Sequence, residues 1–458
     1  MKKLRFLTAL YFSKMIAILI KIIAPDKGSN LPGEYALKID PQFIRHIKNL
    51  DMDKVICITG TNGKSTTTNL VAHIFKNAGI SVAANLAGAN MLPGVATTMI
   101  NNTSLTGKLN KDLVLLETDE RFLPIIRREL PAKNLCILNV FKDQVHRNGE
   151  PDIIWRKIDS AIDEDMTLFV NANEPNACAF NKKVKNYISF GVDRNSASYE
   201  KKDDFFAITM PCPICHDNIE FDYYNIESVG KFHCPHCGFG NERPVDYLAK
   251  NIDFENKTFE YDGKEYTFGY STPYFLYCYI AAIAITKAFG VSEDVIDASM
   301  KSFVNIGGRM EALHIGHQDM RYMRIKQEGP ETLQSALNVA RADKNEKDFA
   351  LGLFEVTDTK PHYVPTFYTY DCDFRGLIAS DLNRCVCFSK TTANDAALRI
   401  LYDGFNEENM EIIATDNFDA VLDEVKNSEC DNVYFITWLQ EYEKMKKLAN
   451  SNNEDKEV

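Results

Sequence analysis

The sequence predicts an α/β protein with mostly parallel sheets, a cysteine-rich insertion and a second, smaller α/β domain at its C-terminal end. Two observations carry this prediction. Short apolar runs alternate with stretches of helical periodicity, as in parallel sheets whose strands are joined by helices. Two C-x-x-C pairs lie between residues 203 and 267, where the chain becomes polar and aromatic. An insertion into the first domain is therefore expected there.

The elements of the first domain follow one another in a regular order. The apolar stretch 6–24 predicts a helix, and the spacing of apolar residues predicts further helices over 64–78 and 274–289. Ligands are expected at the carboxyl ends of the strands, as in other parallel sheets. The predicted strands are 54–58, 80–84, 112–116, 134–139, 167–171 and 187–191, with hairpin-like runs at 258–261 and 265–268.

The length of 458 residues favours two or three domains. We expect residues 1–50 to form the N-terminal helix and a lead-in, and residues 51–310 to form the central domain, with the insertion at about 205–245. Residues 311–458 are expected to form the smaller domain. Its predicted strands are 350–354, 385–388, 411–414 and 432–437, and the polar residues 451–458 are expected to be disordered.

The composition limits the classes of protein that fit. Hydrophobic residues make up 45% and charged residues 25% of the chain, as in a soluble globular protein. The formal net charge of −12 argues against a nucleic acid as the main partner. An acidic protein that binds an anion such as ATP must concentrate positive potential locally, at a loop or at the start of a helix.

The N-terminal helix allows three interpretations. Lys14 and Lys21 interrupt its apolar run, which argues against a membrane span. Pro25, Asp26 and Lys27 follow it in place of a small-residue cleavage site, which argues against a cleaved signal peptide. A buried packing helix is favoured, and an interfacial helix in peripheral contact with the inner face of the membrane stays open. A cytoplasmic location is predicted in either case.

A glycine-rich loop carries the strongest catalytic pattern. Gly60, Thr61, Asn62, Gly63, Lys64, Ser65 and Thr66 follow a predicted strand and open a predicted helix. Glycines allow the backbone to approach a phosphate, and the N–H groups of a helix start meet its charge. Lys64 adds a positive charge, and the hydroxyl of Ser65 or Thr66 suits Mg²⁺. The alternative is an ordinary glycine-rich turn with a solvated lysine.

The cysteines predict one metal centre. Eight of the twelve are scattered, mostly through apolar stretches, which fits reduced thiols in a cytosolic protein. The other four form two C-P-x-C pairs that suit one tetrahedral, structural Zn²⁺ ion. The alternatives are unrelated buried cysteines or a redox pair. The predicted ligands are Cys212, Cys215, Cys234 and Cys237.

The loop resembles that of the Mur ligase superfamily, whose ATP-binding loop reads T-G-T-x-G-K-[ST]. The resemblance continues through residues 116–120, 139–150, 171–175 and 308–311. It implies a Mur-ligase-type central ATPase domain. It also implies that Lys64 is catalytic, that Ser65 and Glu117 hold Mg²⁺, that Asn171 lies near the nucleotide base and that Arg309 reaches the phosphates. Taken alone, Glu117, Asp119 and Glu120 would be interpreted as a solvated acidic loop.

The zinc ribbon narrows the resemblance to one branch of this family, the synthetase subunits of lipid II isoglutaminyl synthase. Residues 31–33 and 85–90 also resemble that branch. The resemblance implies that ATP phosphorylates the α-carboxylate of D-glutamate in the cell-wall precursor lipid II. Ammonia from a separate GatD-like glutaminase, the second subunit of a heterodimer, then displaces the phosphate.

A further role is implied for the smaller domain. In this branch an aspartate completes the Cys–His pair of the partner glutaminase, and Asp371 is the best match, with Asp373 next. An acceptor carboxylate orients a catalytic imidazole. The alternative is a carboxylate in an ordinary turn at a strand end.

Departures from the branch keep other functions open. They include Phe275 and Cys278, at a helix start that is rich in asparagine in the family, and residues 326–330, 354–357 and 364–367. A paralogue with another carboxylate substrate, a stand-alone ligase that joins an amino acid to a carboxylate, and a nucleotide-binding scaffold without turnover are the alternatives. A zinc-ribbon protein that binds nucleic acid fits poorly with the acidic charge.

Overall fold

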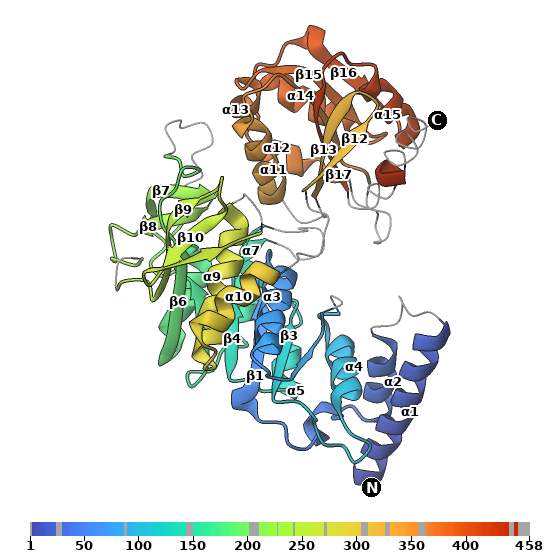
Figure 1. The fold of residues 1–458 in the computed structure, drawn as a ribbon, viewed down its shortest axis with the longest axis vertical. Helices are drawn as coiled ribbons and strands as arrows, with labels where there is room; N and C mark the ends of the chain where they lie inside the picture. Colours follow the sequence, from blue (N-terminus) through green and yellow to red (C-terminus); the bar gives the residue numbers. More distant parts are fainter. Residues whose placement is uncertain are drawn as a thin grey trace. The chain divides into compact units, whose positions relative to one another are not determined.

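A computed structural model describes residues 2–23, 30–86, 89–142, 150–200, 210–226, 228–240, 243–269, 273–303, 310–325, 330–355, 362, 364–438 and 444–447. The chain divides into two compact units. The first contains residues 1–141 and 150–305, and the second contains residues 142–149 and 306–458. Each unit is an α/β structure built on its own mostly parallel sheet (Figure 1), so the predicted fold class is confirmed.

The first unit is built on a nine-stranded sheet with the order β11-β10-β9-β6-β5-β4-β1-β3-β2. The seven strands from β9 to β2 are parallel, whereas at the other edge β10 runs antiparallel to both of its neighbours, β9 and β11. The carboxyl ends of the parallel strands therefore meet at one edge of the sheet. The strands are β1 (Val55–Thr59), β2 (Val82–Ala84), β3 (Leu113–Glu117), β4 (Asn134–Ile137), β5 (Thr167–Asn171), β6 (Asn186–Val192), β9 (Tyr247–Asp253), β10 (Thr258–Tyr261) and β11 (Lys264–Thr267).

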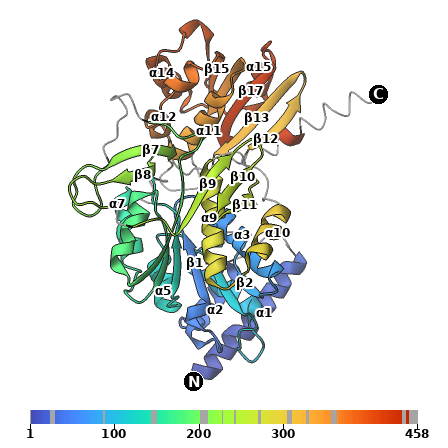
Figure 2. The ribbon, with the colours of Figure 1, turned by 60° about the vertical axis from the view of Figure 1, so that its left-hand side comes forward.

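The polar, aromatic stretch 203–267 does not form one insertion. Its last part, residues 247–267, belongs to the large sheet, because β9 pairs with β6, and β10 and β11 extend the same sheet (Figure 2). Phe259 and Tyr266 alternate with polar neighbours, and both are buried in the core beneath the sheet. Only β7 (Glu220–Ile226) and β8 (Val229–His233) form a separate two-stranded sheet.

Helices cover both faces of the large sheet. Along β1, Val55 and Cys57 face one apolar core, and Ile56 and Ile58 face the other. This alternation follows from the two-residue period of a strand, and burial on both faces explains why the strand is apolar throughout. On the first face lie α1 (Lys2–Ile23), α2 (Leu31–Ile39), α4 (Leu92–Asn102), α5 (Leu123–Glu129) and α7 (Pro151–Asp159), and on the second lie α3 (Lys64–Asn77), α9 (Pro273–Ala288) and α10 (Glu293–Ser302).

The N-terminal helix is only half buried. Phe6, Leu10 and Ala17 of α1 pack into the unit, whereas most of its other apolar side chains face outward. Lys14, which argued against a membrane span, donates to the backbone oxygen of Ile100 at 2.7 Å. It thereby caps the C-terminal end of α4, and burial lowers the pKa of its ammonium group. Among the described residues, α1 alone is long and apolar enough to cross a membrane by length and composition.

The second unit contains a six-stranded sheet with the order β12-β13-β17-β14-β15-β16. Only β12 is antiparallel to its neighbour. The β12–β13 hairpin was not predicted, because its alternation of Met320 and Tyr322 with charged residues is short. The elements are β12 (Met310–Ile315), β13 (Gln318–Ile325), β14 (Lys347–Gly352), β15 (Leu382–Phe388), β16 (Met410–Ile413), β17 (Asn432–Trp438), α11 (Pro330–Ala342), α12 (Phe367–Tyr370), α13 (Arg375–Ile378), α14 (Ala393–Tyr402) and α15 (Phe418–Lys426).

Short helical turns complete the two units. Near the zinc-ribbon region, α8 (Pro175–Cys178) continues directly into the 3₁₀ turn η3 (Ala179–Lys183). The other 3₁₀ turns are η1 (Ile44–His46), η2 (Met52–Lys54) and η5 (Glu407–Asn409).

Candidate nucleotide site and metal centre

The glycine-rich loop connects β1 to α3 at the carboxyl edge of the large sheet. Gly60 has a φ of +134°, and a Cβ atom there would lie 3.0 Å from the Cβ of Leu138. Gly63, with a φ of +86°, directly precedes the first residue of α3. Both positions therefore require glycine, and the backbone N–H groups at the start of α3 lie next to the loop.

Asn139, which follows β4, holds the loop in shape. Its backbone oxygen accepts from the N–H of Thr61 at 3.1 Å, and its Oδ1 accepts from the N–H of Asn62 at 2.8 Å. Its Nδ2 donates to the backbone oxygen of Asn62 at 3.1 Å. Asn139 was not among the predicted site residues. A polar residue directly after a buried strand was the available signal, but the partner lies 77 residues away.

Lys64, the first residue of α3, folds back over the loop. Its Nζ donates to the backbone oxygens of Gly60 and Thr61, the latter at 3.0 Å, and lies 3.0 Å from Oε1 of Glu120. Burial raises the pKa of the Glu120 carboxyl, against the opposing attraction of Lys64. The lysine is thus positioned beside the loop, with a carboxylate as its counter-ion.

Glu117 ends β3 beside this loop. The register pairs Glu117 with Ile58, two residues before Gly60. Asn85 fixes the backbone of Glu117 through hydrogen bonds of 2.8 Å to its N–H and its carbonyl oxygen. The side chain is only 3% exposed. Oε1 accepts from Nδ2 of Asn90 at 3.3 Å, whereas the buried Oε2 has no hydrogen-bond partner among the described residues.

An unpartnered buried carboxylate oxygen is costly unless a cation or donor satisfies it. Mg²⁺ takes few protein oxygens and keeps several waters, and it is commonly bound through carboxylates together with substrate phosphates. Glu117, with Ser65 in the first turn of α3, therefore fits the donor set that this ion requires.

Asn171 ends β5 and is 2% exposed. Its Nδ2 donates to the backbone oxygen of Leu138 at 3.0 Å, and its Oδ1 accepts from the N–H of Asn173 at 3.0 Å. It therefore supports the segment that packs against Gly60, and a direct contact with a base remains a prediction. The other predicted nucleotide ligand of this group, Arg309, lies outside the described residues.

Glu174 was not among the predicted site residues. It is fully buried, and its carboxylate accepts from the backbone N–H groups of Val140, Asn176 and Ala177, each at 2.9 Å. It thereby caps α8 and ties this helix to the segment after β4. Burial raises its pKa to about 7, although the three donors favour the ionised form.

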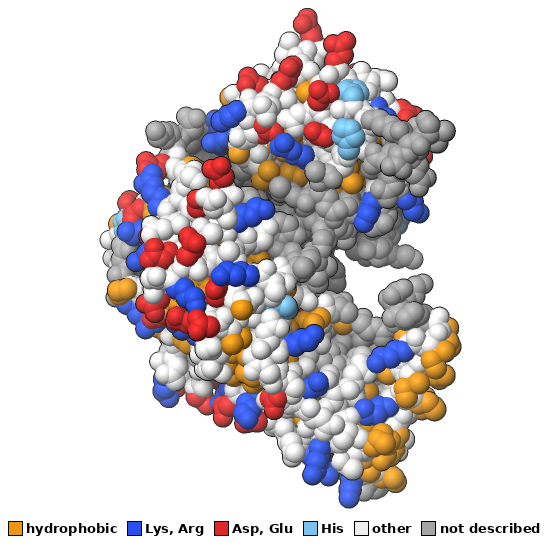
Figure 3. Space-filling model, viewed as in Figure 1, with side chains coloured by type: hydrophobic (Ala, Val, Ile, Leu, Met, Phe, Trp, Pro, Cys, Tyr) orange, Lys and Arg blue, Asp and Glu red, His pale blue; other side chains and the backbone are white. Residues whose placement is uncertain are grey.

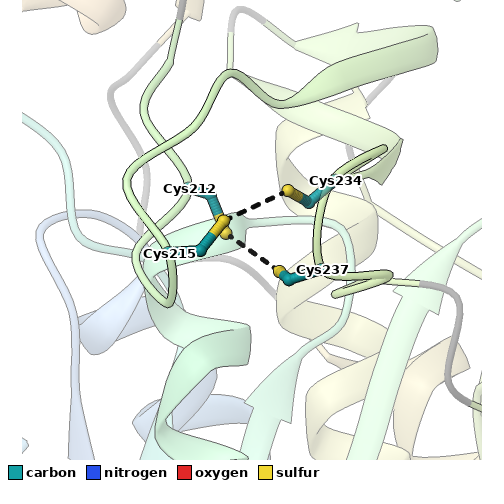
Figure 4. Close-up of side chains that lie close together, drawn as sticks. All are labelled: Cys212, Cys215, Cys234 and Cys237. Carbon is teal, nitrogen blue, oxygen red and sulfur yellow. Dashed lines mark hydrogen bonds between the residues drawn. The ribbon is translucent and has the colours of Figure 1, made fainter.

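The four predicted zinc ligands lie together. Their sulfur atoms are all within 4.8 Å of one another (Figure 4). The Sγ atoms of Cys212 and Cys237 are 3.7 Å apart, and those of Cys215 and Cys234 are 3.5 Å apart. Tetrahedral Zn²⁺ with Zn–S bonds of 2.3 Å requires sulfur separations of about 3.8 Å. The cluster therefore fits one zinc ion with four thiolates and no open position.

Each cysteine pair forms a tight turn. The N–H of His216 donates to the backbone oxygen of Cys212, and the N–H of Gly238 donates to that of Cys234, both at 2.9 Å. The backbone N–H of Cys237 donates to the sulfur of Cys234 and lowers the pKa of its thiol to about 7. Such donors favour the thiolate form that binds metal. A small apolar core anchors the cluster to the end of α8, through Cys178, Ala179, Ile219, Phe232 and Phe239.

The two aspartates after α12 differ in their partners. Both oxygens of Asp373 pair with the guanidinium of Arg375, at 3.0 and 3.1 Å. Burial opposes ionisation of Asp373, but these hydrogen bonds lower the pKa of its carboxyl below the usual value. The side chain of Asp371 is 38% exposed and lies 2.8 Å from Nζ of Lys142 in the same unit. The two side chains are almost equally exposed, at 38% and 37%, so Asp371 and Asp373 differ in their partners and not in accessibility.

Comparison with known proteins agrees with these features. A sequence profile described as MurT ligase C-terminal matches residues 327–442. The chain is 27% identical to a lipid II isoglutaminyl synthase (glutamine-hydrolyzing) subunit MurT of Streptococcus pneumoniae, over 90% of each chain. It is 25% identical to the subunit of the same name of Staphylococcus aureus strain COL, over 86% of this chain and 87% of that one.

Solved structures share the fold at low sequence identity. A pseudomurein peptide ligase type C from Methanothermus fervidus superposes with a TM-score of 0.66 and 16% identity, over 87% of this chain and 79% of that one. A MurF ligase from Thermotoga maritima in complex with ADP superposes with a TM-score of 0.60 and 13% identity, over 93% of this chain and 85% of that one.

The fold, the loop after β1 and these similarities define a ligase of the Mur ligase family, so the predicted class of enzyme is confirmed. Within that family the chain is similar to MurT subunits over 86–90% of its length, at 25–27% identity. Those relatives are named as subunits, which implies a partner in their complexes.

Proposed function

We propose that the chain is the ATP-dependent synthetase subunit of a glutamine amidotransferase that amidates lipid II during peptidoglycan synthesis. The acceptor is the α-carboxylate of the D-glutamate residue, which becomes isoglutamine. The names of the relatives support the reaction class and the substrate. A single structural observation supports the nucleotide chemistry. The glycine-rich loop with Lys64 follows β1, and Glu117 ends the adjacent strand β3 with one carboxylate oxygen that has no hydrogen-bond partner among the described residues.

The reaction proceeds in two steps. A carboxylate oxygen attacks the γ-phosphorus of ATP, the bond between that phosphorus and the ADP oxygen breaks, and an acyl phosphate forms. The nitrogen of ammonia then attacks the acyl carbon, the carbon–oxygen bond to phosphate breaks, and ammonia loses a proton. The first step is required because a carboxylate is a poor electrophile without a leaving group.

The chain's own groups bind and orient the phosphates in this scheme. The N–H groups at the start of α3 and the ammonium of Lys64 stabilise negative charge on the phosphate oxygens. Phosphates that bind there would compete with Glu120 for Lys64. Ser65 and Glu117 would hold Mg²⁺, which supplies charge neutralisation between the phosphates when bound.

The remaining groups have structural and partner roles. The four cysteines would hold one structural Zn²⁺ ion, away from the chemistry. A GatD-like glutaminase would release ammonia from glutamine, and Asp371 would orient the histidine of its Cys–His pair. The two hydrogen bonds that hold Asp373 on Arg375 support this choice, since Asp371 pairs through one oxygen with Lys142.

The test supplies the purified, zinc-loaded chain with lipid II, ATP, Mg²⁺ and ammonium, and measures amidated product by mass spectrometry. Ammonium replaces the partner, so product is expected without a glutaminase. Lys64→Ala should lower the rate at least about a hundredfold, because it removes charge stabilisation at the transferring group. Lys76→Ala, on the exposed last turn of the same helix, is the matched control and should leave the rate unchanged.

Two results would overturn the proposal. The absence of measurable affinity for Mg·ATP by calorimetry would exclude the enzyme interpretation. If the chain hydrolyses ATP and amidates another carboxylate but not lipid II, the proposed class of enzyme is correct and the proposed acceptor is wrong.

A further inference from the structure

The outward face of α1 is a continuous apolar surface in the first unit. Ile18 is 59% exposed, Met15 52% and Ile22 73%. In Figure 3 apolar side chains gather over α1 and α2, with basic side chains beside them. We refer to this surface as the outward face of α1, formed by Leu4, Tyr11, Met15, Ile18 and Ile22 and bordered by Phe12, Leu19 and Ile23.

The helix is fixed in its orientation by its opposite side. At 3.6 residues per turn, the five residues that form the outward face fall within an arc of about 60°. Phe6, Leu10 and Ala17 lie on the other side and are buried against the unit. Since these contacts belong to the folded core, the outward apolar face is a property of the folded protein and not of a loose terminus.

The charges beside this face have one sign. Helix α1 contains five basic residues and no acidic residue, in a chain whose net charge is −12. Lys3 and Lys21 are exposed, and at helical spacing both lie on the same flank of the outward face. Lys14 lies on that flank too but donates to Ile100. The positive charge therefore lies next to the apolar surface.

Aromatic side chains add a third feature. Tyr11 is 49% exposed and Phe12 39%. The ring of Phe12 meets that of Tyr35, on α2, edge to face at 5.7 Å, and Nζ of Lys38 lies 5.2 Å from the centre of the Tyr35 ring. Tyrosine at the edge of an apolar face with lysine beside it is typical of helices that lie at a membrane–water interface.

From this combination we propose that α1 lies in the plane of an anionic phospholipid surface, with its outward face among the acyl chains and Lys3 and Lys21 at the headgroups. Charge complementarity selects an anionic bilayer as the occupant, since apolar burial and headgroup attraction act together on such a helix. The helix does not span the bilayer, because its inner side remains packed on the unit. The inference goes beyond the proposed function and does not rest on it.

The experiment measures flotation of the purified full-length chain with vesicles of phosphatidylcholine, with or without phosphatidylglycerol. Binding to the anionic vesicles and little binding to the neutral vesicles are expected. Ile18→Asp should weaken binding at least about tenfold, because it places a charge in the apolar face. Leu398→Asp, on α14 and also 59% exposed, is the matched control and should bind as the parent does.

A second pair of variants tests the charge. The double variant Lys3→Gln, Lys21→Gln should weaken binding to anionic vesicles by about twenty-five-fold, since each surface lysine contributes roughly a factor of five. Lys250→Gln with Lys257→Gln removes the same charge from exposed positions in and after β9 and should have little effect. Calorimetric affinity for Mg·ATP should be equal in all variants, which separates this proposal from the proposed function.

Three results would overturn the proposal: no binding of the parent chain to either vesicle, equal weakening by Ile18→Asp and Leu398→Asp, or equal weakening by the two double variants. A fourth result would show that another molecule covers the outward face of α1. If analytical ultracentrifugation shows a dimer of the parent chain that Ile18→Asp dissociates, the outward face is covered by a second copy.

Discussion

At the scale of single residues, the candidate nucleotide site is organised by short polar side chains at strand ends. Asn139 shapes the loop and Asn85 holds the backbone of Glu117. Neither side chain needs to touch a ligand to matter, because each satisfies backbone groups that are buried and would otherwise be unpaired. The backbone that carries the charged residues Lys64 and Glu117 is thereby held in a fixed position, as charge stabilisation by preorganised groups requires.

The first residue-scale prediction concerns Glu117. Glu117→Gln keeps the shape of the side chain and removes its negative charge, so Mg²⁺ should bind more weakly. We expect amidation to fall at least about a hundredfold and the Mg²⁺ concentration for half-maximal rate to rise. The measurement is the rate of ADP release in a magnesium titration with saturating acceptor and ammonium.

Glu129→Gln serves as the control, since Glu129 is also a buried carboxylate of the first unit, 9% exposed. It should change thermal stability without a change in the magnesium dependence. A parent-like magnesium titration for Glu117→Gln would remove this residue from the proposed metal site.

The second residue-scale prediction concerns Glu174, whose pKa burial raises from 4.5 to about 7. The native state therefore holds this proton more tightly than the unfolded state. The stabilisation is fully present below the unfolded pKa and is lost as the pH rises through about 7. The loss amounts to about 3 kcal/mol in the free energy of unfolding.

The measurement is denaturant unfolding of the zinc-loaded chain between pH 5 and pH 8. Glu174→Gln cannot titrate, so its stability should decline less over this range than that of the parent. It should be less stable at low pH, because its amide nitrogen faces a backbone N–H in place of an acceptor. Parallel stability curves for the two proteins would show that Glu174 does not titrate in this window.

At the scale of elements, the zinc ribbon is a small unit with little core of its own. Only two strands and a few apolar side chains support it, and a two-stranded hairpin is marginal in water. Bound metal would therefore contribute much of its stability, as in other small zinc-binding modules. The apolar contacts with Cys178 and Ala179 connect that stability to the end of α8.

The element-scale prediction follows directly. The parent chain should contain about one zinc ion, and Cys234→Ser should contain almost none, since three thiolates hold Zn²⁺ far less tightly than four. The ribbon should then become sensitive to proteolysis, and the midpoint of thermal unfolding should fall. The measurements are elemental analysis and limited proteolysis with mass spectrometry.

Cys430→Ser is the matched control, because Cys430 is partly exposed and lies in the other unit. It should retain zinc and parent-like proteolysis. Full zinc content in Cys234→Ser would show that the ligand set is different.

At the scale of the whole molecule, the two units are proposed to serve two reactions. The first carries the nucleotide loop, and the second carries Asp371, which is proposed to act on a partner's active site. A substitution in one unit should therefore separate the ammonium-driven reaction from the glutamine-driven one. Such a separation distinguishes an amidotransferase subunit from a stand-alone ligase.

The corresponding prediction uses Asp371→Asn in the complex with a GatD-like glutaminase. The glutamine-driven rate should fall at least about a hundredfold, because the partner's histidine loses its orienting carboxylate. The ammonium-driven rate should stay within about twofold, since the nucleotide site is unchanged. Mass spectrometry of amidated lipid II measures both rates.

Asp373→Asn provides the comparison. It removes the carboxylate that holds Arg375 and should lower stability without this selective loss. Equal reduction of both rates by Asp371→Asn would refute the assigned role, and selective loss in Asp373→Asn would transfer that role to Asp373.

Much of the fold could be predicted because its signals are local. The strand over 167–171 was placed at its observed bounds, and the helix after the loop was placed to within one residue. The hairpin of β10 and β11 was placed to within one residue, but its membership of the large sheet was not predicted, and β9 and the β12–β13 hairpin were missed. Their alternation is short and polar, and their place in the sheets depends on pairing with strands far along the chain.

The sequence by itself determined the glycine-rich loop, the four clustered thiols and the resemblance to Mur ligases, because fixed spacing of a few residue types carries that information within one turn or one hairpin. The tertiary structure decided the rest. It showed that Asn139 shapes the loop, that Glu117 keeps an unpartnered oxygen, that Asp373 is occupied by Arg375 and that α1 exposes one apolar face. Each of these depends on burial and on partners brought together by folding, which no local pattern records.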